Sequence, residues 1–215
     1  MIKARFGDRI DHWIHVAFPF LFWRRLDPNL LTVIGTGVSA VAAACLATGH
    51  LLVGGLLILA GGFFDLVDGV VARHFQSSTP FGAFLDSTMD RLVDMLILFG
   101  LIIYFSASGR VGIVMLTGVV LVGSVMTSYA KARAELFVPH LDGGMFERGE
   151  RIGLIALGAI LGIMVPVLWL LAIGTSVTVV QRFAGAYRAL ARIELASPEP
   201  GSAASAVNPS PGRAP

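Results

Sequence analysis

The sequence predicts an all-α integral membrane protein with six transmembrane helices, preceded by an amphipathic helix on the cytoplasmic membrane surface. Hydrophobic residues make up 55% of the 215 positions, charged residues only 14%, and the mean hydropathy is +0.79. Soluble domains carry about a quarter charged residues. In addition, the charged residues stand between long apolar runs, and the basic ones fall almost entirely on alternate connections.

The first three helices follow from the apolar runs in chain order. Residues 28–64 contain no Asp, Glu, Lys or Arg, and this run is long enough for two helices of about 20 residues. The small and polar residues 48–50 are the natural break between the two. A third helix is expected over residues 81–105, closed by the Ser-Ala-Ser-Gly sequence at 106–109.

The remaining three helices are predicted in the same way. Residues 111–130 are free of charge and give the fourth helix. The run 152–181 is too long for one span, so we expect Pro166 to break it into a fifth and a sixth helix. That assignment requires both helices to extend past the charged residues at their outer ends.

The distribution of Lys and Arg predicts the orientation. Basic residues cluster before the first span, around the second-to-third and fourth-to-fifth links, and after the sixth span. The opposite links hold only Arg110 and His50. Because cytoplasmic loops carry the excess of Lys and Arg, we expect both termini in the cytoplasm and the protein in the cell (inner) membrane.

The two ends of the chain differ from the middle. Residues 1–24 are predicted to be an amphipathic interfacial segment, since Phe6, Ile10 and Trp13 recur at helical spacing among polar residues. Residues 196–215 are rich in Pro, Ser, Ala and Gly and are predicted to be disordered. The six-helix membrane domain is expected to occupy residues 27–192.

Charge and cysteine content exclude several classes. The formal net charge of +2 is too small to indicate a nucleic-acid partner. Cys45 is the only cysteine, so neither an intramolecular disulfide nor a thiolate metal cluster can form within one chain.

Four aspartates stand at the edges of two neighbouring apolar runs. Asp65 and Asp68 are three positions apart near the end of the second span, and Asp86 and Asp90 are four apart near the start of the third. Each pair therefore shares one helix face, and a short turn makes the two helices antiparallel neighbours. An uncompensated carboxylate costs about 2.5–3.5 kcal/mol at mid-membrane. The four carboxylates are therefore expected to converge on divalent cations, Mg²⁺ or Mn²⁺ for oxygen ligands.

The alternative is that these aspartates solvate helix ends or pair with Arg73 and Arg91. Four acidic residues at these spacings, with almost no other acid nearby, favour the metal site. The small residues Gly69 and Ala72 favour it further, because they let a nucleotide or a backbone approach closely.

The pattern Asp65-x2-Asp68-Gly69-x2-Ala72-Arg73-x8-Gly82-x3-Asp86-x3-Asp90 resembles, at every specified position, the signature of the CDP-alcohol phosphotransferase family. The resemblance implies six membrane helices, usually a homodimer, and two metal ions per active site, Mg²⁺ with Mn²⁺ as the alternative. The implied metal ligands are Asp65, Asp68, Asp86 and Asp90, of which Asp90 would also be the general base. The implied CDP-lipid contacts are Asn29, Leu30, Leu31, Thr32, Asp68, Gly69, Ala72, Arg73, Thr79 and Gly82.

Physical chemistry agrees with that implied reaction. Metal ions beside a pyrophosphate neutralise its charge, which favours attack at the lipid-side phosphorus and departure of CMP. A carboxylate within reach of the attacking hydroxyl takes its proton. Asp94, one turn beyond Asp90, lies outside the signature, and we expect it to support neighbouring side chains or to have a structural role.

Basic residues farther along the chain indicate the acceptor. Ser128 and Lys131 are three positions apart, as are Arg148 and Arg151, and Arg182 lies on the same predicted side of the membrane. The positive-inside rule accounts for part of this charge. A cationic rim beside an anionic metal pocket also suits an acceptor that carries its own phosphate.

The runs at 128–135 and 147–151 are similar to those of the phosphatidylinositol phosphate synthase branch of the family, found in actinobacteria, and of its archaeal archaetidyl counterpart. The resemblance implies that Ser128, Lys131, Arg151 and Arg182 bind the phosphate of inositol phosphate, and Arg148 joins this predicted set. The expected reaction moves a phosphatidyl group from CDP-diacylglycerol to 1L-myo-inositol 1-phosphate, giving phosphatidylinositol phosphate and CMP. The resemblance covers residues 27–190 and departs at 136–141 and in the tail.

Two other functions remain open at this point. The same reaction with glycerol 3-phosphate as acceptor would make the protein a phosphatidylglycerophosphate synthase. A divalent-cation transporter also uses intramembrane aspartates, but carriers usually place them near the midplane of broken helices, often in repeated halves. Here the aspartates lie on one side and come with Arg73 and a strict glycine spacing.

Overall fold

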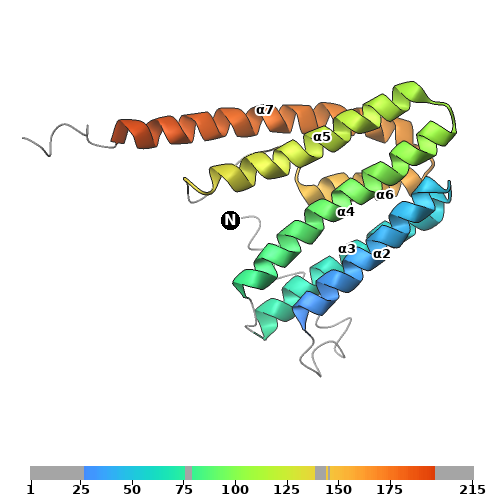
Figure 1. Cartoon of the computed structure of the whole chain (residues 1–215), viewed down its shortest axis with the longest axis horizontal. Helices are drawn as coiled ribbons and strands as arrows, with labels where there is room; N and C mark the ends of the chain where they lie inside the picture. The colour runs from blue at the N-terminus through green and yellow to red at the C-terminus, as the bar shows by residue number, and fades with distance from the viewer. Residues whose placement is uncertain (1–26, 76–78, 139–143, 145, 197–215) are drawn as a thin grey trace, which may run out of the picture.

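The computed structural model describes residues 27–75, 79–138, 144 and 146–196, and all regular structure in these residues is helical. Six helices follow one another along the described chain, joined by short connections (Figure 1). They are α2 (Pro28–Ala47), α3 (Leu51–His74), α4 (Pro80–Ala107), α5 (Val111–Ala134), α6 (Arg148–Ile160) and α7 (Met164–Ala196). The predicted sequence of helical segments from residue 28 onward is therefore present. The predicted interfacial segment 1–24 and the tail from 197 lie outside the described residues.

Three tight turns join the helices in pairs at one end of the molecule, at the right of Figure 1. Each turn contains a glycine with positive φ: Gly49 (85°), Gly109 (68°) and Gly162 (70°). A residue with a Cβ is strained at positive φ, so glycine is favoured where these helices end. α3 and α5 end, and α4 begins, toward the opposite end, so successive helices run up and down (Figure 1).

The prediction that Pro166 breaks the last apolar run is wrong. The break lies at residues 161–163, around Gly162, and Pro166 belongs to the first turn of α7. Proline is tolerated there because the first amide groups of a helix have no intrahelical acceptor in any case. The two helices do extend past the charged residues at their outer ends, as that prediction requires, since α6 starts at Arg148 and α7 continues past Arg182.

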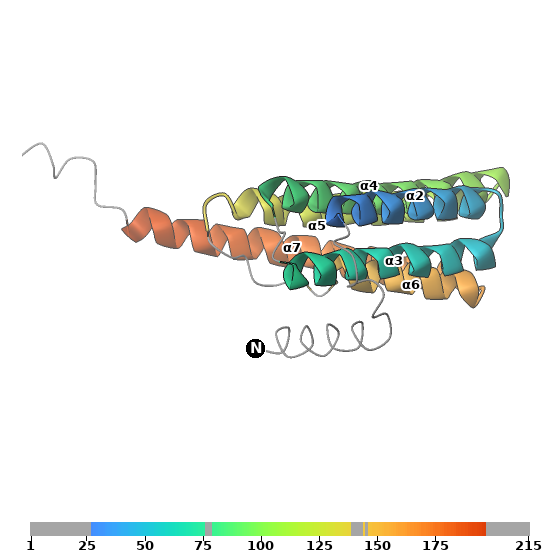
Figure 2. The ribbon, with the colours of Figure 1, turned by 90° about the horizontal axis from the view of Figure 1, so that it is seen from below.

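The helices pack in two layers, with α2 and α4 over α3 and α6 (Figure 2). α2 contacts both α3 and α4, and α5 contacts α4 and α7. The main apolar core includes Leu46, Ile97, Leu101 and Leu168, all buried. α2 and α4 approach so closely that a Cβ on Gly100 would collide with the backbone of Ala43.

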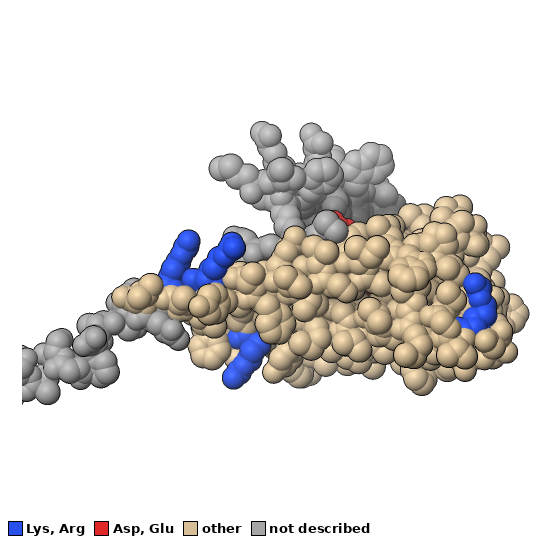
Figure 3. Space-filling model, turned by 90° about the horizontal axis from the view of Figure 1, so that it is seen from above, with Lys and Arg blue, Asp and Glu red and all other residues tan. Residues whose placement is uncertain are grey.

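Four of the helices, α2, α3, α5 and α7, are long and apolar enough to cross a bilayer. α4 has the length but carries Asp86, Asp90 and Asp94, and α6 has only 13 residues, which is about 20 Å of helix. In Figure 3 the visible Lys and Arg side chains lie toward the two ends of the long axis, and the face between them shows only a small acidic patch beside the grey residues. A wide apolar surface with charge at its ends indicates a membrane protein.

Candidate active site

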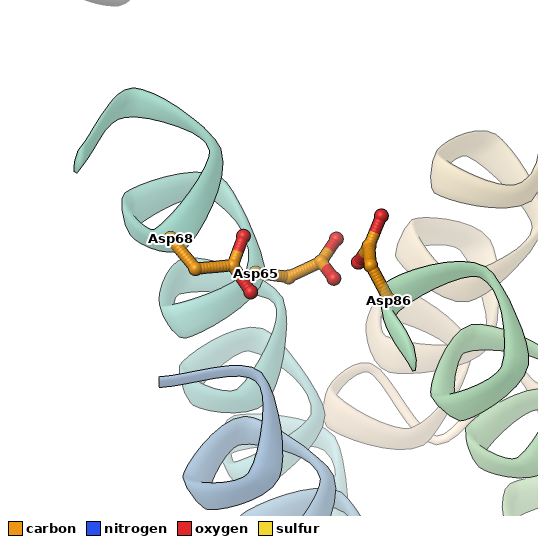
Figure 4. Close-up of side chains that lie close together, drawn as sticks. All are labelled: Asp65, Asp68 and Asp86. Atoms are coloured by element: carbon orange, nitrogen blue, oxygen red, sulfur yellow. The ribbon is translucent and has the colours of Figure 1, made fainter. Parts of the chain in front are cut away.

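Three of the predicted metal ligands come together between α3 and α4. Asp65 and Asp68 project from one face of α3, and Asp86 projects toward them from α4 (Figure 4). One carboxylate oxygen from each lies within 4.8 Å of the others. The donors are all hard oxygens at a spacing that one divalent ion could bridge after small side-chain movements, so the residues fit Mg²⁺ or Mn²⁺.

Asp68 has a partner on a third helix. The hydroxyl of Thr32 on α2 donates a 2.6 Å hydrogen bond to Asp68 Oδ2, and both residues are buried. The same hydroxyl lies 3.1 Å from the carbonyl oxygen of Pro28. Thr32 was predicted to contact a CDP-lipid, and the structure places it against a metal-ligand candidate.

Asp90 lies outside the group of three and is paired with an arginine. Arg148 Nη1 is 2.7 Å from Asp90 Oδ1 and 3.0 Å from Asp65 Oδ2. Arg148 is the first residue of α6, whose start is fixed by reciprocal hydrogen bonds between Glu147 and Glu150. This helix start therefore delivers a guanidinium to the carboxylates of both α3 and α4.

A second arginine of α6 is buried against α4. Arg151 Nη2 is 2.7 Å from Asp94 Oδ2, and both side chains are almost fully inaccessible. Arg151 Nη1 also reaches Thr127 Oγ1 at 3.5 Å and the carbonyl oxygen of Phe146 at 3.4 Å. The acidic row on α4 thus continues beyond the metal-ligand candidates into an ion pair.

Two cavities meet at this cluster. The first, of about 320 Å³, runs between α2 and α3, where it is lined by apolar residues such as Leu59 and Leu66, and it reaches Asp65 and Asp90. The second, of about 310 Å³, is polar and lies among α4, α5, α6 and α7. Asp90 and Arg148 line both cavities.

All five predicted acceptor-binding residues line the second cavity: Ser128, Lys131, Arg148, Arg151 and Arg182. They come from three helices, α5, α6 and α7, so the fold brings together residues that are far apart in the sequence. Glu135 lines the same cavity and lies 3.9 Å from Lys131.

The predicted CDP-lipid contacts are more scattered. Thr32 lines the first cavity, and Asn29, Thr79 and Gly82 cluster where α4 begins, with Thr79 Oγ1 accepting from Gly82 N at 3.0 Å. Arg73 lies over Gly69, whose missing Cβ leaves room for the guanidinium. Ala72 is half-buried on α3. Leu30 and Leu31 line neither of these two cavities: Leu30 is exposed, and Leu31 packs with Val67 and Val71.

Sequence reasoning missed several contacts. The role of Asp94 was left open, and neither its pairing with Arg151 nor the contact of Thr127 with the arginines was anticipated. Ser87 and Arg91 line the second cavity and were not selected as site residues. A signal was available for Asp94, since it continues the four-residue spacing of Asp86 and Asp90 on one helix face.

An all-helical membrane fold with an acidic cluster beside a basic cavity fits a transferase that uses divalent metal ions. The family model for CDP-alcohol phosphatidyltransferase matches residues 25–187, and the chain belongs to that family. It is therefore an enzyme of this class, which excludes the divalent-cation transporter as its principal function.

Several similar proteins carry the name of one enzyme within this family. The chain is 39% identical to a phosphatidylinositol phosphate synthase of Mycobacteroides abscessus over 164 residues, covering 72% of this chain and 74% of that protein. It also resembles crystal structures of the Mycobacterium tuberculosis phosphatidylinositol phosphate synthase at 31% identity. The complex with CDP-DAG gives a TM-score of 0.70, covering 85% of this chain and 94% of the other. The complex with manganese and citrate gives 0.72, covering 84% and 88%.

Proposed function

We propose that the protein transfers a phosphatidyl group from CDP-diacylglycerol to 1L-myo-inositol 1-phosphate, giving phosphatidylinositol phosphate and CMP. The observation that carries this proposal is the junction of an apolar cavity and a cationic cavity at Asp90 and Arg148. One cavity suits a lipid-linked substrate and the other a small phosphorylated alcohol. The relatives named phosphatidylinositol phosphate synthase support the same assignment.

Asp65, Asp68, Asp86 and Asp90 would hold two Mg²⁺ ions, with Mn²⁺ as the alternative. Asp65, Asp68 and Asp86 already face one another, and the manganese complex of the relative supports a divalent ion here. When bound, the ions supply positive charge that neutralises the pyrophosphate and the departing CMP. Arg148, at 2.7 Å from Asp90, holds positive charge at the same place.

Asp90 is the general base in this proposal. It lies where the two cavities meet, so an acceptor hydroxyl in the second cavity can approach the lipid-side phosphorus beside it. The hydroxyl oxygen forms the new phosphorus–oxygen bond, its proton goes to Asp90, and the bond to the CMP oxygen breaks. The apolar wall at Leu59 and Leu66 suits the lipid chains, and the cluster of Asn29, Thr79 and Gly82 suits the cytidine end.

The basic cavity supports a phosphorylated acceptor over a neutral alcohol. Lys131, Arg151 and Arg182 surround it, and guanidinium groups bind phosphate in a bidentate manner. Glycerol 3-phosphate also carries a phosphate and is the second candidate. The relatives' names favour the inositol compound.

The decisive experiment incubates purified protein and Mg²⁺ with CDP-diacylglycerol and one acceptor at a time, and measures CMP release. We expect release with 1L-myo-inositol 1-phosphate and little with free inositol, which lacks the phosphate. Turnover with glycerol 3-phosphate alone would overturn the inositol assignment but preserve the reaction. No CMP with any acceptor, from folded protein, would overturn the reaction itself.

The membrane arrangement completes the proposal. We infer that α2 to α7 are six spans, with α4 packed against α2 and α5, and α6 packed against α3 and α7. We also infer that residues 27–192 form the catalytic domain. Residues 1–24 would lie on the cytoplasmic surface as an amphipathic segment, and the residues after α7, 197–215, would be a disordered tail. Both termini and the active site would face the cytoplasm of the cell membrane, and two chains would form a homodimer.

A further inference from the structure

Asp94 is a buried anion that lies outside the proposed metal ligands. Its side chain is only 7% exposed, and it faces the 3% exposed side chain of Arg151 at 2.7 Å. Its other oxygen, Oδ1, is 3.5 Å from Arg148 Nε. Asp94 therefore reaches both arginines that the start of α6 contributes to the site, and it is the acidic residue through which α4 contacts Arg151.

The ion pair with Asp94 does not use all the hydrogen-bonding capacity of Arg151, which also lines the second cavity. Arg151 lines that cavity together with Arg182, and the Nε atoms of both are buried without a hydrogen-bond partner among the described residues. Arg182 Nη1 donates to the carbonyl oxygen of Thr127, and Arg151 Nη1 reaches the hydroxyl of the same residue. Thus residues of α4 and α5 hold these two guanidinium groups at the wall of the second cavity, and the described residues leave part of their hydrogen-bonding capacity unused.

We propose that Asp94 is a positioning residue that holds Arg151 in the orientation needed to bind the phosphate of the acceptor. The inference rests on the proposed function for the identity of the acceptor. Asp94 also lines the second cavity. In this proposal it acts through Arg151, whose long side chain would otherwise adopt several rotamers in the cavity. The specificity of the second cavity for a phosphorylated alcohol then depends on a residue of α4 outside the aspartate signature.

When Asp94 is neutralised, a purely electrostatic role and a positioning role predict opposite changes in phosphate affinity, which makes the proposal testable. Neutralising Asp94 makes the cavity more cationic, so charge alone would strengthen phosphate binding. If Asp94 positions Arg151, neutralising it weakens phosphate binding although the net positive charge rises. Glu135→Gln is the matched control, because Glu135 lines the same cavity but pairs with Lys131 near the surface.

The experiment compares wild type, Asp94→Asn and Glu135→Gln in detergent with Mg²⁺ and CDP-diacylglycerol. We expect Asp94→Asn to raise KM for 1L-myo-inositol 1-phosphate roughly tenfold or more, with a smaller change in kcat. Glu135→Gln should leave KM equal to wild type or lower. Binding of inorganic phosphate, followed as thermal stabilisation without any turnover, should weaken in Asp94→Asn only. An unchanged or lower KM and unchanged phosphate binding in Asp94→Asn would overturn the proposal.

A double-mutant cycle with Arg151→Gln tests whether Asp94 acts through that arginine. Asp94→Asn should add little to the KM increase that Arg151→Gln causes by itself, because the two residues form one unit. An independent, additive loss would overturn the proposal. The double variant carries no unpaired buried charge from this pair. If Asp94→Asn alone does not fold, the double variant is compared with Arg151→Gln in its place. If wild type fails to use inositol phosphate, the phosphate-binding arm still tests Asp94, and only the proposed acceptor is lost.

Discussion

The hydroxyl of Thr32 is hydrogen-bonded to Asp68 at 2.6 Å, across 36 positions of sequence. The contact joins α2 to the acidic face of α3 and orients one carboxylate of the three that cluster there. A hydroxyl that donates to a carboxylate leaves the second oxygen of that carboxylate free for an ion. Helix α2 therefore supports the candidate metal centre without contributing a carboxylate to it.

Replacing Thr32 with Val should weaken divalent-metal binding. The isosteric change removes the donor to Asp68, and loss of a hydrogen bond behind a metal ligand typically costs about 10–100-fold in metal affinity or activity. The measurement is CMP release as a function of Mn²⁺ concentration. Thr117→Val is a matched control, because Thr117 is buried and its hydroxyl bonds only its own helix. Equal Mn²⁺ dependence in Thr32→Val and wild type would contradict the supporting role.

Asp90→Asn should abolish turnover while the protein remains folded. A general base contributes about 10²–10⁴-fold, and asparagine cannot accept the hydroxyl proton. Folding should persist because the substitution relieves repulsion among neighbouring carboxylates, and Arg148 keeps its contact with Asp65 at 3.0 Å. CMP release measures the first effect and thermal unfolding the second. Near-normal activity would remove Asp90 from the general-base role.

Gly100→Ala should destabilise the fold where α2 and α4 cross. A Cβ there meets the backbone of Ala43, which cannot move aside as a flexible side chain could. Overpacking of this kind costs about 1–3 kcal/mol of unfolding free energy. Gly118→Ala is the control, since a Cβ at Gly118 has no neighbour within 4 Å among the described residues and alanine is the better helix former. Thermal unfolding in one detergent should rank the variants Gly118→Ala, then wild type, then Gly100→Ala.

The proposed orientation can be tested with single cysteines. In a Cys45→Ala background, Ser108→Cys lies in the turn after α4 and Arg133→Cys near the end of α5, both at exposed positions. A membrane-impermeant thiol reagent added to intact cells should label the first and spare the second until the cells are opened. The reverse pattern would place the active site on the outer side of the membrane.

The helices were largely predictable because apolar runs and glycine turns are local features of the sequence. Residues 48–50 and the turn at Gly109 were located correctly, since glycine supplies the positive φ that these turns need. The prediction placed the last turn at Pro166, whereas the chain turns at Gly162. Proline interrupts a helix only past its first turn, and nothing local showed that α7 begins two residues before it.

The acidic cluster was predictable for a similar reason. Helical spacing places Asp65 and Asp68 on one face, and a short link brings Asp86 opposite them. The pairing of Arg148 with Asp65 spans 83 positions and depends on how α6 packs against α3, which no local pattern encodes. The burial of Leu31 against Val67 and Val71 likewise depends on how α2 packs against α3.

The two cavities that meet at Asp90 and Arg148 differ in the medium from which each would be filled. Leu59 and Leu66 border one of them and are exposed on the apolar surface, whereas Lys131 and Glu135 border the other. One reactant would thus arrive by lateral diffusion in two dimensions and the other from solution in three. We therefore expect the reaction rate to follow the mole fraction of the lipid substrate in a mixed micelle and not its bulk molarity, so that added inert detergent slows the enzyme by surface dilution.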